Sequence, residues 1–405
     1  MAADHRSSPL RTLLTSRAGR ALVGAVGLVG ILTVIGLVVL WPDGSGPKIE
    51  GGAQRTVAAT VARVTTSSCG GPTEQRCATA HLRITEGDDR GRSVPVVLGP
   101  PEVSPDLQPG DDVRVAPQPT GPDRDAAVLA GEGPAYSFVG VDRHGSLLWL
   151  AILFALLGAF VARGRGLLAL GGTAFSMALV VLWLVPAILD GGSPVLVAVV
   201  GALAVMFITT VLTYGITTQS LAAVTGIGIS LVAAGLLGLL WTDLAALDGK
   251  DGELSSFSLQ SGGHLPLQGI LLAGMVIGAL GVLTDTVVSQ VSTVAALHRT
   301  DPSLPARGLY REAFAVGRDH LSATIHTLVL AYAGATLPIL LIVSANGVSF
   351  GDAINDTRLA EPIVSTLVGS AALILAVPLS TALAALLVGR VPTAALGDGH
   401  HHHHH

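Results

Sequence analysis

Long uncharged runs alternate with short polar segments along most of the chain, and this pattern predicts membrane-spanning helices. The first run, Ala21–Leu40, has about 20 residues, enough to cross a bilayer core of roughly 30 Å at 1.5 Å per residue. A cleaved signal peptide would have a shorter apolar region that ends in a small-x-small site. This run ends in Leu40-Trp41-Pro42, so we favour an uncleaved anchor over residues 21–41, preceded by a basic segment over residues 1–20.

Further apolar runs follow one another from residue 147 to residue 390. Each resembles a spanning segment in length and composition, so with the anchor they predict a polytopic α-helical membrane protein of about eight transmembrane helices. The runs are Leu147–Ala162, Gly166–Leu189, Pro194–Leu212, Leu221–Trp241, Pro266–Thr284, Leu321–Ser344 and Ile363–Gly389.

Residues 44–143, between the first two predicted spans, have a different pattern. Ala78–Thr85 alternates apolar with polar residues, as a half-buried strand does, and similar short runs are Val57–Val64, Val94–Leu98 and Val113–Val115. About five short strands in this length predict a small β-barrel or sandwich. An OB-like barrel is our expectation for this β-rich domain.

Composition agrees with a membrane protein and narrows its function. The chain is 50% hydrophobic and only 13% charged, with a mean hydropathy of +0.63. His400–His405 is interpreted as a purification tag within a tail over residues 397–405. No phosphate-binding loop, HExxH motif or zinc-type Cys/His spacing is present, so we expect no cofactor, no metal and no enzyme activity. No basic run with interleaved aromatic residues is present, so nucleic acid is not an expected partner.

The distribution of basic residues predicts the orientation in the membrane. With the N-terminus inside and eight spans, the predicted outer short loops receive only Lys250 and Arg358, together with many carboxylates. This assignment makes both termini cytoplasmic and exports the β-rich domain. The predicted cytoplasmic arginines are Arg6, Arg11, Arg17, Arg20, Arg163, Arg165, Arg299, Arg307, Arg311, Arg318 and Arg390.

The two cysteines, Cys69 and Cys77, both lie in the exported domain. In an oxidising compartment they can form a disulfide that closes a short loop and contributes roughly 2–3 kcal/mol. Two free thiols are the alternative. A metal site would need two ligands besides the nearby His81, and the sequence does not supply them close by.

Polar residues cluster in three of the predicted spans, at one depth in the cytoplasmic half of the membrane. Ionisable groups at membrane depth are costly and usually face a cavity or a partner, so we expect a solute site there. The candidate residues are Asp285, Ser289, Gln290, Arg318, Asp319, Thr324, His326, Thr327, Tyr332, Thr213 and Gln219.

Each of these residues also has a purely structural interpretation. Asp285 would be solvated if it lies at the headgroup level, and His326 would be satisfied by one hydrogen bond to a neighbouring helix. Threonine hydroxyls often bond to carbonyls of their own helix. If Asp285 and His326 are close, their protonation is coupled, which suits proton-linked work.

Several motifs in this region resemble those of the YibE/F family of bacterial membrane proteins. The resemblance rests on residues 278–290, on Leu309-Tyr310-Arg311 leading to Gly317-Arg318-Asp319-His320, and on residues 324–338. It extends from the β-rich domain through Asp142-Arg143-His144 to about Arg390. The resemblance implies the same architecture and leaves the substrate open. One position departs from the family pattern, which implies an asparagine where this chain has His326. A neutral amide would suffice for hydrogen bonding there, so the departure weakens a proton-shuttling role for His326.

From these features we predict a secondary transporter that moves a small solute or ion across a bacterial plasma membrane. The expected partners are the lipid bilayer and that solute, and a homo-oligomer is compatible with the glycine-rich spans. The rival from another class is an envelope scaffold or receptor-like protein whose exported β-domain binds a partner. An intramembrane enzyme acting on lipid-linked substrates has only Asp285 and His326 in its favour.

Overall fold

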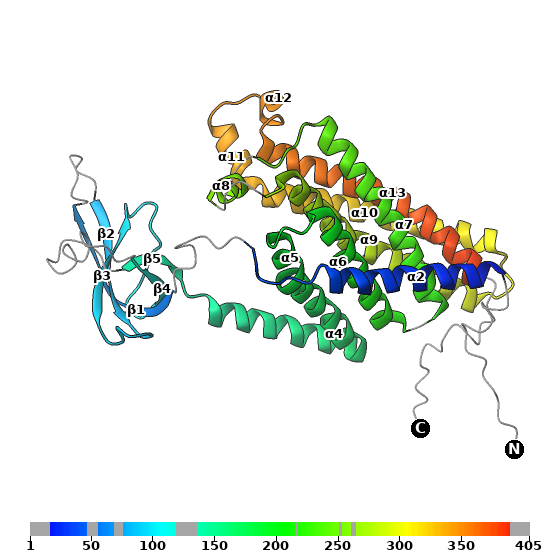
Figure 1. Ribbon diagram of the computed structural model, residues 1–405, viewed down its shortest axis with the longest axis horizontal. Coiled ribbons are helices and arrows are strands. Elements are labelled where there is room, and N and C mark those ends of the chain that lie inside the picture. The colour runs from blue at the N-terminus through cyan, green and yellow to red at the C-terminus, as the bar shows by residue number, and fades with distance from the viewer. Residues whose placement is uncertain are drawn as a thin grey trace, which may run out of the picture. The chain divides into compact units, whose positions relative to one another are not determined.

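We analysed a computed structural model, which describes residues 17–46, 56–68, 76–118, 136–215, 217–250, 253–260 and 265–388. The chain divides into two compact units. A helical unit comprises Met1–Pro47 and Ala159–His405, and a β unit comprises Lys48–Gly158 (Figure 1). A β-rich segment and a helical region were both expected from the sequence, and each unit is described separately below.

The β unit is a curled antiparallel sheet with the strand order β3-β2-β1-β4-β5. The edge strand β3 also lies against the other edge strand, β5, so the sheet bends back on itself. Buried aliphatic residues such as Val61, Leu82 and Val113 form its core. The strands are β1 (Val57–Ser68), β2 (Arg76–Ile84), β3 (Ser93–Gly99), β4 (Asp112–Pro117) and β5 (Tyr136–Val141).

A buried tyrosine ties the start of β5 to the turn between β2 and β3. The Tyr136 hydroxyl donates a hydrogen bond of 2.6 Å to Oδ2 of Asp89. Burial, together with the neighbouring carboxylate, raises the pKa of Tyr136 to about 12. The same hydrogen bond lowers the pKa of Asp89 below its ordinary value, with a further contribution from Arg92. The pair is therefore a structural link in which both groups keep their usual charge at neutral pH.

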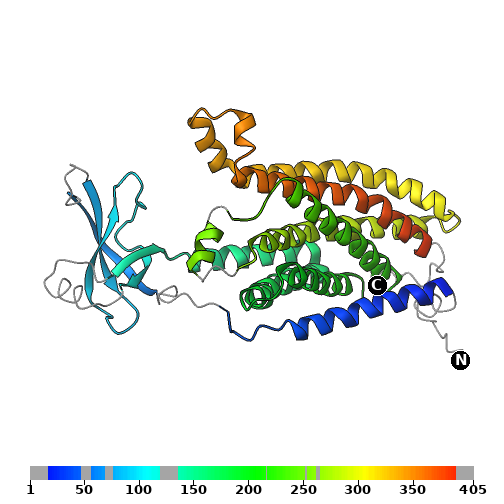
Figure 2. The same cartoon turned by 45° about the horizontal axis from the view of Figure 1, so that its top comes forward.

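The helical unit contains long helices that run roughly parallel or antiparallel to one another (Figure 1). Its central contacts join α7, α9 and α13, with α6 and α10 packed against α9, and α2 packed on α6 (Figure 2). The helices are α2 (Arg17–Val39), α4 (His144–Leu179, shared with the β unit), the π-helix η1 (Val180–Leu184), α5 (Val185–Leu189), α6 (Pro194–Tyr214), α7 (Thr218–Leu244), α8 (Glu253–Gln260), α9 (Leu267–Thr300), α10 (Ala306–Ala335), α11 (Leu337–Ala345), α12 (Phe350–Ala353) and α13 (Thr357–Val388).

Seven helical segments in the described ranges are long and apolar enough to cross a membrane. The bent pair α10 and α11 raises this number to eight if it is counted as one span. The sequence pattern indicated one continuous run over Leu321–Ser344, whereas the structure bends by 58° at Thr336. Pro338, in the first turn of α11, has no backbone N–H and so cannot donate the hydrogen bond that would continue the helix.

The helices of the central bundle approach closely because small residues lie at their crossings. A Cβ added to Gly226 on α7 would lie 3.1 Å from the Cβ of Ser380 and 3.2 Å from Cγ1 of Val287. The surrounding core is made of fully buried aliphatic side chains such as Leu283 and Leu373. Small residues at such contacts stabilise helix association in lipid, where no hydrophobic drive exists between helices.

One end of α5 holds the segment that follows α2. Both carboxylate oxygens of Asp190 accept hydrogen bonds from backbone N–H groups, from Gly44 at 2.8 Å and from Gly46 at 2.7 Å. In η1, which precedes α5, the Trp183 indole N–H donates to the carbonyl of Leu37 at 3.2 Å. The segment after α2 is therefore attached to the helical unit as far as Gly46.

Candidate functional site

Gln290 on α9 forms a buried link among three helices. Its Nε2 donates hydrogen bonds to the carbonyl of Ala313 on α10 at 2.9 Å and to the hydroxyl of Thr381 on α13 at 2.7 Å. Thr381 in turn donates to the carbonyl of Val377 at 2.6 Å. Gly317 leaves room for the amide, since a Cβ there would lie 2.7 Å from Cδ of Gln290. Gln290, predicted to line a solute site, is only 3% exposed and holds helices together.

Asp285 and Ser289 lie on a different side of α9 from Gln290, and both are exposed. Gly274, Gly278 and Gly281 are exposed on the same stripe, since successive members are three or four residues apart along the helix. An added Cβ at Gly274 or Gly281 would find no atom within 4 Å. This glycine stripe is therefore largely uncovered by the rest of the described chain.

The polar residues of α10 likewise face outward. Arg318, Asp319, His326 and Thr327 are exposed, and Thr324 is half-buried. The hydroxyls of Thr324 and Thr327 donate to carbonyls four residues earlier in the same helix, at 2.9 and 3.0 Å. The threonines thus behave as the structural interpretation expected. Arg318, Asp319 and His326 take part in no salt bridge with another described residue.

Two contacts define the register between the antiparallel helices α9 and α10. Gln290 lies beside Gly317, and an added Cβ at Gly278 would lie 3.3 Å from the half-buried Tyr332 hydroxyl. Asp285 lies between Gly278 and Gln290 along α9. Its level on α10 therefore falls between Gly317 and Tyr332, about five residues from Gly317.

This level corresponds to the stretch of α10 that carries Arg318, Ser322 and His326, all exposed. Four salt bridges occur among the described residues, and none of them includes Asp285, Arg318, Asp319 or His326. The structure therefore brings Asp285 and Ser289 to the same depth as these groups on the outer surface of the helical unit, without pairing them.

Two other predicted residues lie apart from this group. Gln219 is buried in the first turn of α7, next to a capping box in which Thr217 and Ser220 exchange hydrogen bonds. Because Gly226 packs on Val287 and the helices are antiparallel, Gln219 lies well beyond Asp285, toward the end of α9. The side chain of Thr213 is outside the described residues.

Three buried hydroxyls near Asp285 were not named as site residues from the sequence. The Oγ1 atoms of Thr210, Thr284 and Thr286 have no hydrogen-bond partner within the described ranges. Thr284 and Thr286 flank Asp285, and the contact of Pro194 with Gly269 aligns Thr210 on α6 with the same depth. The feature of the sequence that could have indicated Thr284 and Thr286 is the polar triplet Thr284-Asp285-Thr286 in a mainly apolar run.

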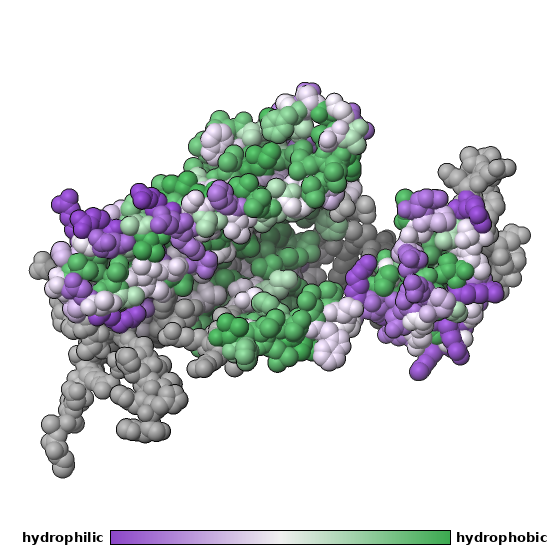
Figure 3. Space-filling model, turned by 180° about the vertical axis from the view of Figure 1, so that it is seen from behind, coloured by the Kyte–Doolittle hydropathy of each residue, from purple (hydrophilic) through white to green (hydrophobic). Residues whose placement is uncertain are grey.

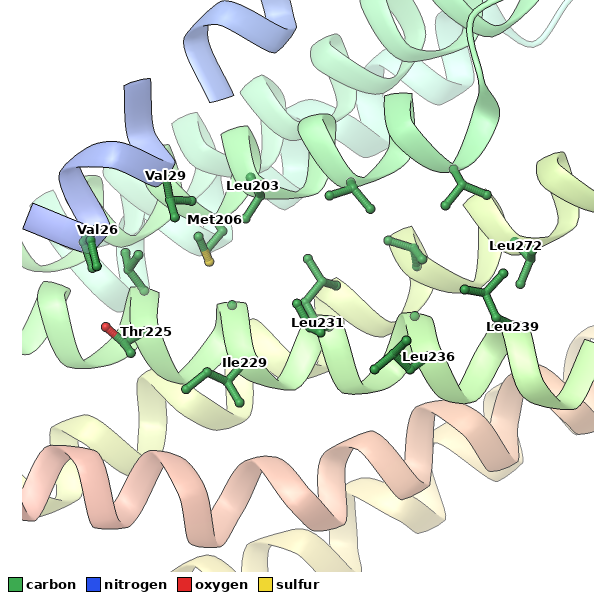
Figure 4. A pocket seen from close by; sticks show the side chains of 18 of the residues that line it. Val26, Val29, Leu203, Met206, Thr225, Ile229, Leu231, Leu236, Leu239 and Leu272 are labelled. Carbon is green, nitrogen blue, oxygen red and sulfur yellow. The ribbon is translucent and has the colours of Figure 1, made fainter. Parts of the chain in front are cut away.

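A separate groove in the helical unit is apolar. A groove of about 620 Å³ lies among α2, α6, α7 and α9, lined by aliphatic side chains such as Leu203, Ile229 and Leu236 (Figure 4). Thr225 is its one hydroxyl side chain, and that hydroxyl donates to the carbonyl of Leu221 at 2.7 Å. The groove therefore offers no free polar group to a charged solute.

Hydrophobic residues cover much of the visible side of the helical unit, and hydrophilic residues gather toward one end of it (Figure 3). The start of α2 and the end of α13 lie together at one end of this unit (Figure 1). Such a surface is that of a protein whose long helices contact hydrocarbon.

The β unit contains one of the two cysteines that the sequence analysis considered. Cys77 is buried and disulfide-bonded, whereas Cys69 lies outside the described residues. Nε2 of His81 lies 3.4 Å from the hydroxyl of Thr65. Among the residues that the structure describes, no group of three or more His, Cys, Asp or Glu side chains is placed to hold a metal ion.

Comparison with known proteins agrees with the motifs in α9 and α10. No curated protein and no solved structure matches the chain. A family model described as "YibE/F-like protein" matches residues 150–390, more than half of the 405 residues, and this range includes α9, α10 and α13. The resemblance found from the sequence motifs is thereby confirmed, and the chain is a membrane protein that belongs to the YibE/F family.

Proposed function

We propose that the protein is a secondary transporter that moves a small charged solute or an ion across a bacterial plasma membrane. The observation that carries this proposal is the group of unpaired, exposed ionisable residues on α9 and α10: Asp285, Arg318, Asp319 and His326. Ionisable residues within spanning segments are expensive and typically mark a pathway for substrate or protons.

The orientation that we propose has eight spans, with both termini in the cytoplasm and the β unit outside. It rests on the arginine-rich segments predicted to be cytoplasmic. Leu267 then lies near the outer surface, and Asp285 lies roughly 27 Å deeper at 1.5 Å per residue. In a hydrocarbon core of about 30 Å this is the cytoplasmic half of the membrane.

The residue types at this depth support a charged solute. Arg318 would hold an anion or neutralise a carboxylate, and Asp285 and Asp319 would hold a cation or a proton. Ser289 supplies a neutral hydrogen-bonding group near this depth, and Tyr332 supplies another nearer the outer surface, beside Gly278. Because the sequence has no nucleotide-binding loop, an ion gradient is the energy source that we propose, and we propose no catalytic step.

A non-transporting envelope scaffold is the second candidate, and one observation favours it. The polar residues of α9 and α10 face outward, while the inner contact between these helices is closed by Gln290 and Gly317. In this alternative the β unit, which we take to be OB-like because its five-stranded sheet curls until β3 meets β5, would bind a partner.

Flux into proteoliposomes distinguishes the two functions. Vesicles containing the full chain and a pH-sensitive dye are given a pH gradient, and a panel of inorganic anions and cations is added in turn. We expect one member of the panel to cause a proton-coupled signal in the wild type, and Asp285→Asn with Asp319→Asn to reduce it by about tenfold or more.

The matched control is Glu312→Gln, because Glu312 is also exposed on α10 but pairs with the adjacent Arg311 at 3.1 Å. This variant should retain wild-type flux. A wild-type protein that gives no flux with any ion would favour the scaffold. Flux that survives in the Asp285→Asn, Asp319→Asn variant would refute the proposed site.

A further inference from the structure

One surface of the helical unit combines open glycines with unpaired charges. We call it the α9–α10 face and define it by six exposed residues: Gly274, Gly281, Asp285, Ser289, Arg318 and His326. On α9 the glycines leave a track with open space above it. On α10 the buried residues Leu309, Ala313 and Gly317 form a strip that packs against the bundle. Most other residues of this helix are exposed.

Lipid alone is a poor neighbour for this face. Acyl chains cannot accept or donate hydrogen bonds, and an ionisable group costs about 2.5–3.5 kcal/mol at the centre of the bilayer on insertion scales and less toward its cytoplasmic edge, where Asp285 and Arg318 lie in the proposed orientation. Asp285 and Arg318 carry opposite charges, yet they form no salt bridge within the chain as described. A partner that is both close-packed and charged would cover the open glycines and neutralise both groups.

The first half of α4 does not supply such a partner. From Gly145 to Ala162 it contains no Asp, Glu, Lys or Arg, so it cannot neutralise Asp285 or Arg318. A second copy of the chain can neutralise both, because it presents the complementary charge at the matching depth. Asp285 lies level with the stretch of α10 between Gly317 and Tyr332, which carries Arg318 and His326.

Membrane insertion fixes the orientation of both copies, so a symmetric pair has its two-fold axis along the bilayer normal. Such an isologous contact brings each residue to its partner at the same depth and forms every heterologous pair twice. We propose that two copies of this chain associate through the α9–α10 face, with Asp285 of each copy against Arg318 and His326 of the other. The glycine track on α9 of each copy then lies against α10 of the other copy, because small residues permit close approach.

This association would complete the polar site between two copies. That part of the inference rests on the proposed transport function, whereas the contact itself does not. The two are separated by reading association and flux independently in the same variants.

Charge reversal in trans tests the contact. Two full-length copies with different affinity tags are co-expressed, extracted into lipid nanodiscs, and scored for the fraction of one copy that purifies with the other. Asp285→Arg alone places two arginines opposite each other in each pair, and Arg318→Asp alone places two carboxylates opposite each other. We expect each variant, paired with itself, to lose about tenfold or more of the co-purified fraction.

Mixing the two variants is the decisive measurement. Arg at position 285 of one copy then faces Asp at position 318 of the other, and the second contact keeps its native Asp285 and Arg318. Co-purification should return to near the wild-type fraction. The control is Arg358→Asp, an exposed arginine in the first turn of α13, at the opposite end of that helix from the Gln290 link, which should leave association unchanged.

Each outcome is informative. If the wild type does not co-purify, or if the single variants associate as well as the wild type, the proposal is wrong. If the mixture does not recover, the two residues meet within one chain or with another partner, and the proposal is also wrong. Recovery of association in a protein that gives no flux would support the two-copy contact and refute the transport function.

Discussion

Gly317→Ala is expected to destabilise the helical unit through one buried side chain. The new methyl group would lie 2.7 Å from Cδ and 2.8 Å from Oε1 of Gln290, and closer still to Nε2. Carbon atoms pack at about 3.5–4.0 Å, so the amide must move. A movement of that size breaks its hydrogen bonds to Ala313 and Thr381, which are 2.9 and 2.7 Å long.

The magnitude follows from those two bonds and from the steric displacement. Interhelical hydrogen bonds in membrane proteins average about 0.6 kcal/mol each, so losing both costs about 1.2 kcal/mol. Forcing an extra methylene into a packed core costs about 1–3 kcal/mol more. We therefore expect Gly317→Ala to lower the free energy of unfolding by about 2–4 kcal/mol.

A double-mutant cycle separates this cause from a general effect of alanine at position 317. Gln290→Ala removes the amide and leaves space for the methyl, so it should cost about 1–2 kcal/mol alone. In the combined variant the methyl of Gly317→Ala no longer meets an amide, and its own cost should largely vanish. The free energies are measured by reversible denaturant unfolding in detergent micelles.

The reasoning is refuted if Gly317→Ala is as stable as the wild type. It is also refuted if the costs of the two substitutions simply add, because additivity would mean that the methyl and the amide do not share space. A helix-propensity effect alone would stabilise the alanine variant by up to about 1 kcal/mol, which is the opposite sign.

Two further predictions concern the β unit and the segment that follows α2. Tyr136→Phe should cost about 1 kcal/mol in the β unit and speed hydrogen exchange in its strands, a modest value because the Asp89 side chain is 40% exposed. The hydrogen bond lowers the pKa of Asp89, so its contribution to stability is present at neutral pH and is lost as the pH falls below about 4. The pKa of Tyr136 is raised to about 12, so the same contribution is lost again as the pH rises from about 10 to 12. A stability difference between wild type and Tyr136→Phe that does not change with pH would contradict this. Asp190→Ala should speed amide exchange at Gly44 and Gly46 and leave the β unit unchanged, and protection equal to the wild type would show that the carboxylate does not hold these amides.

Hydrophobic periodicity was sufficient to predict a mostly helical chain with apolar helices and a separate β-rich segment, but not every element or boundary, since α9 continues to Thr300 and α10 begins at Ala306. The runs that begin at Pro194 and Pro266 coincide with the starts of α6 and α9, because proline is well suited to the first turn of a helix. The strand over Ala78–Thr85 was found from its alternation, which follows directly from one buried and one exposed face. The bend at Thr336 was not predicted, because Leu321–Ser344 is continuous in hydropathy.

The sequence could not predict whether an individual polar residue faces the bundle or the outer surface. Gln290 and Ser289 are adjacent, yet the first is buried between three helices and the second is exposed. The difference depends on which neighbours α9 acquires, and one residue of offset turns a helix by about 100°. Likewise, the sequence of a glycine stripe does not show whether the stripe packs against another helix of the same chain or stays uncovered, as it does at Gly281.

The carboxylate of Asp190 has a mechanical consequence. It accepts hydrogen bonds from the backbone N–H groups of Gly44 and Gly46. A force applied to the chain after Gly46 therefore acts first on these two hydrogen bonds and on α5, and only afterwards on α2. The helix α2 is thereby shielded from a force applied to the chain after Gly46. Any partner that exerts a force on the β unit through this segment would act on the helical unit at the end of α5, through the hydrogen bonds of the Asp190 side chain.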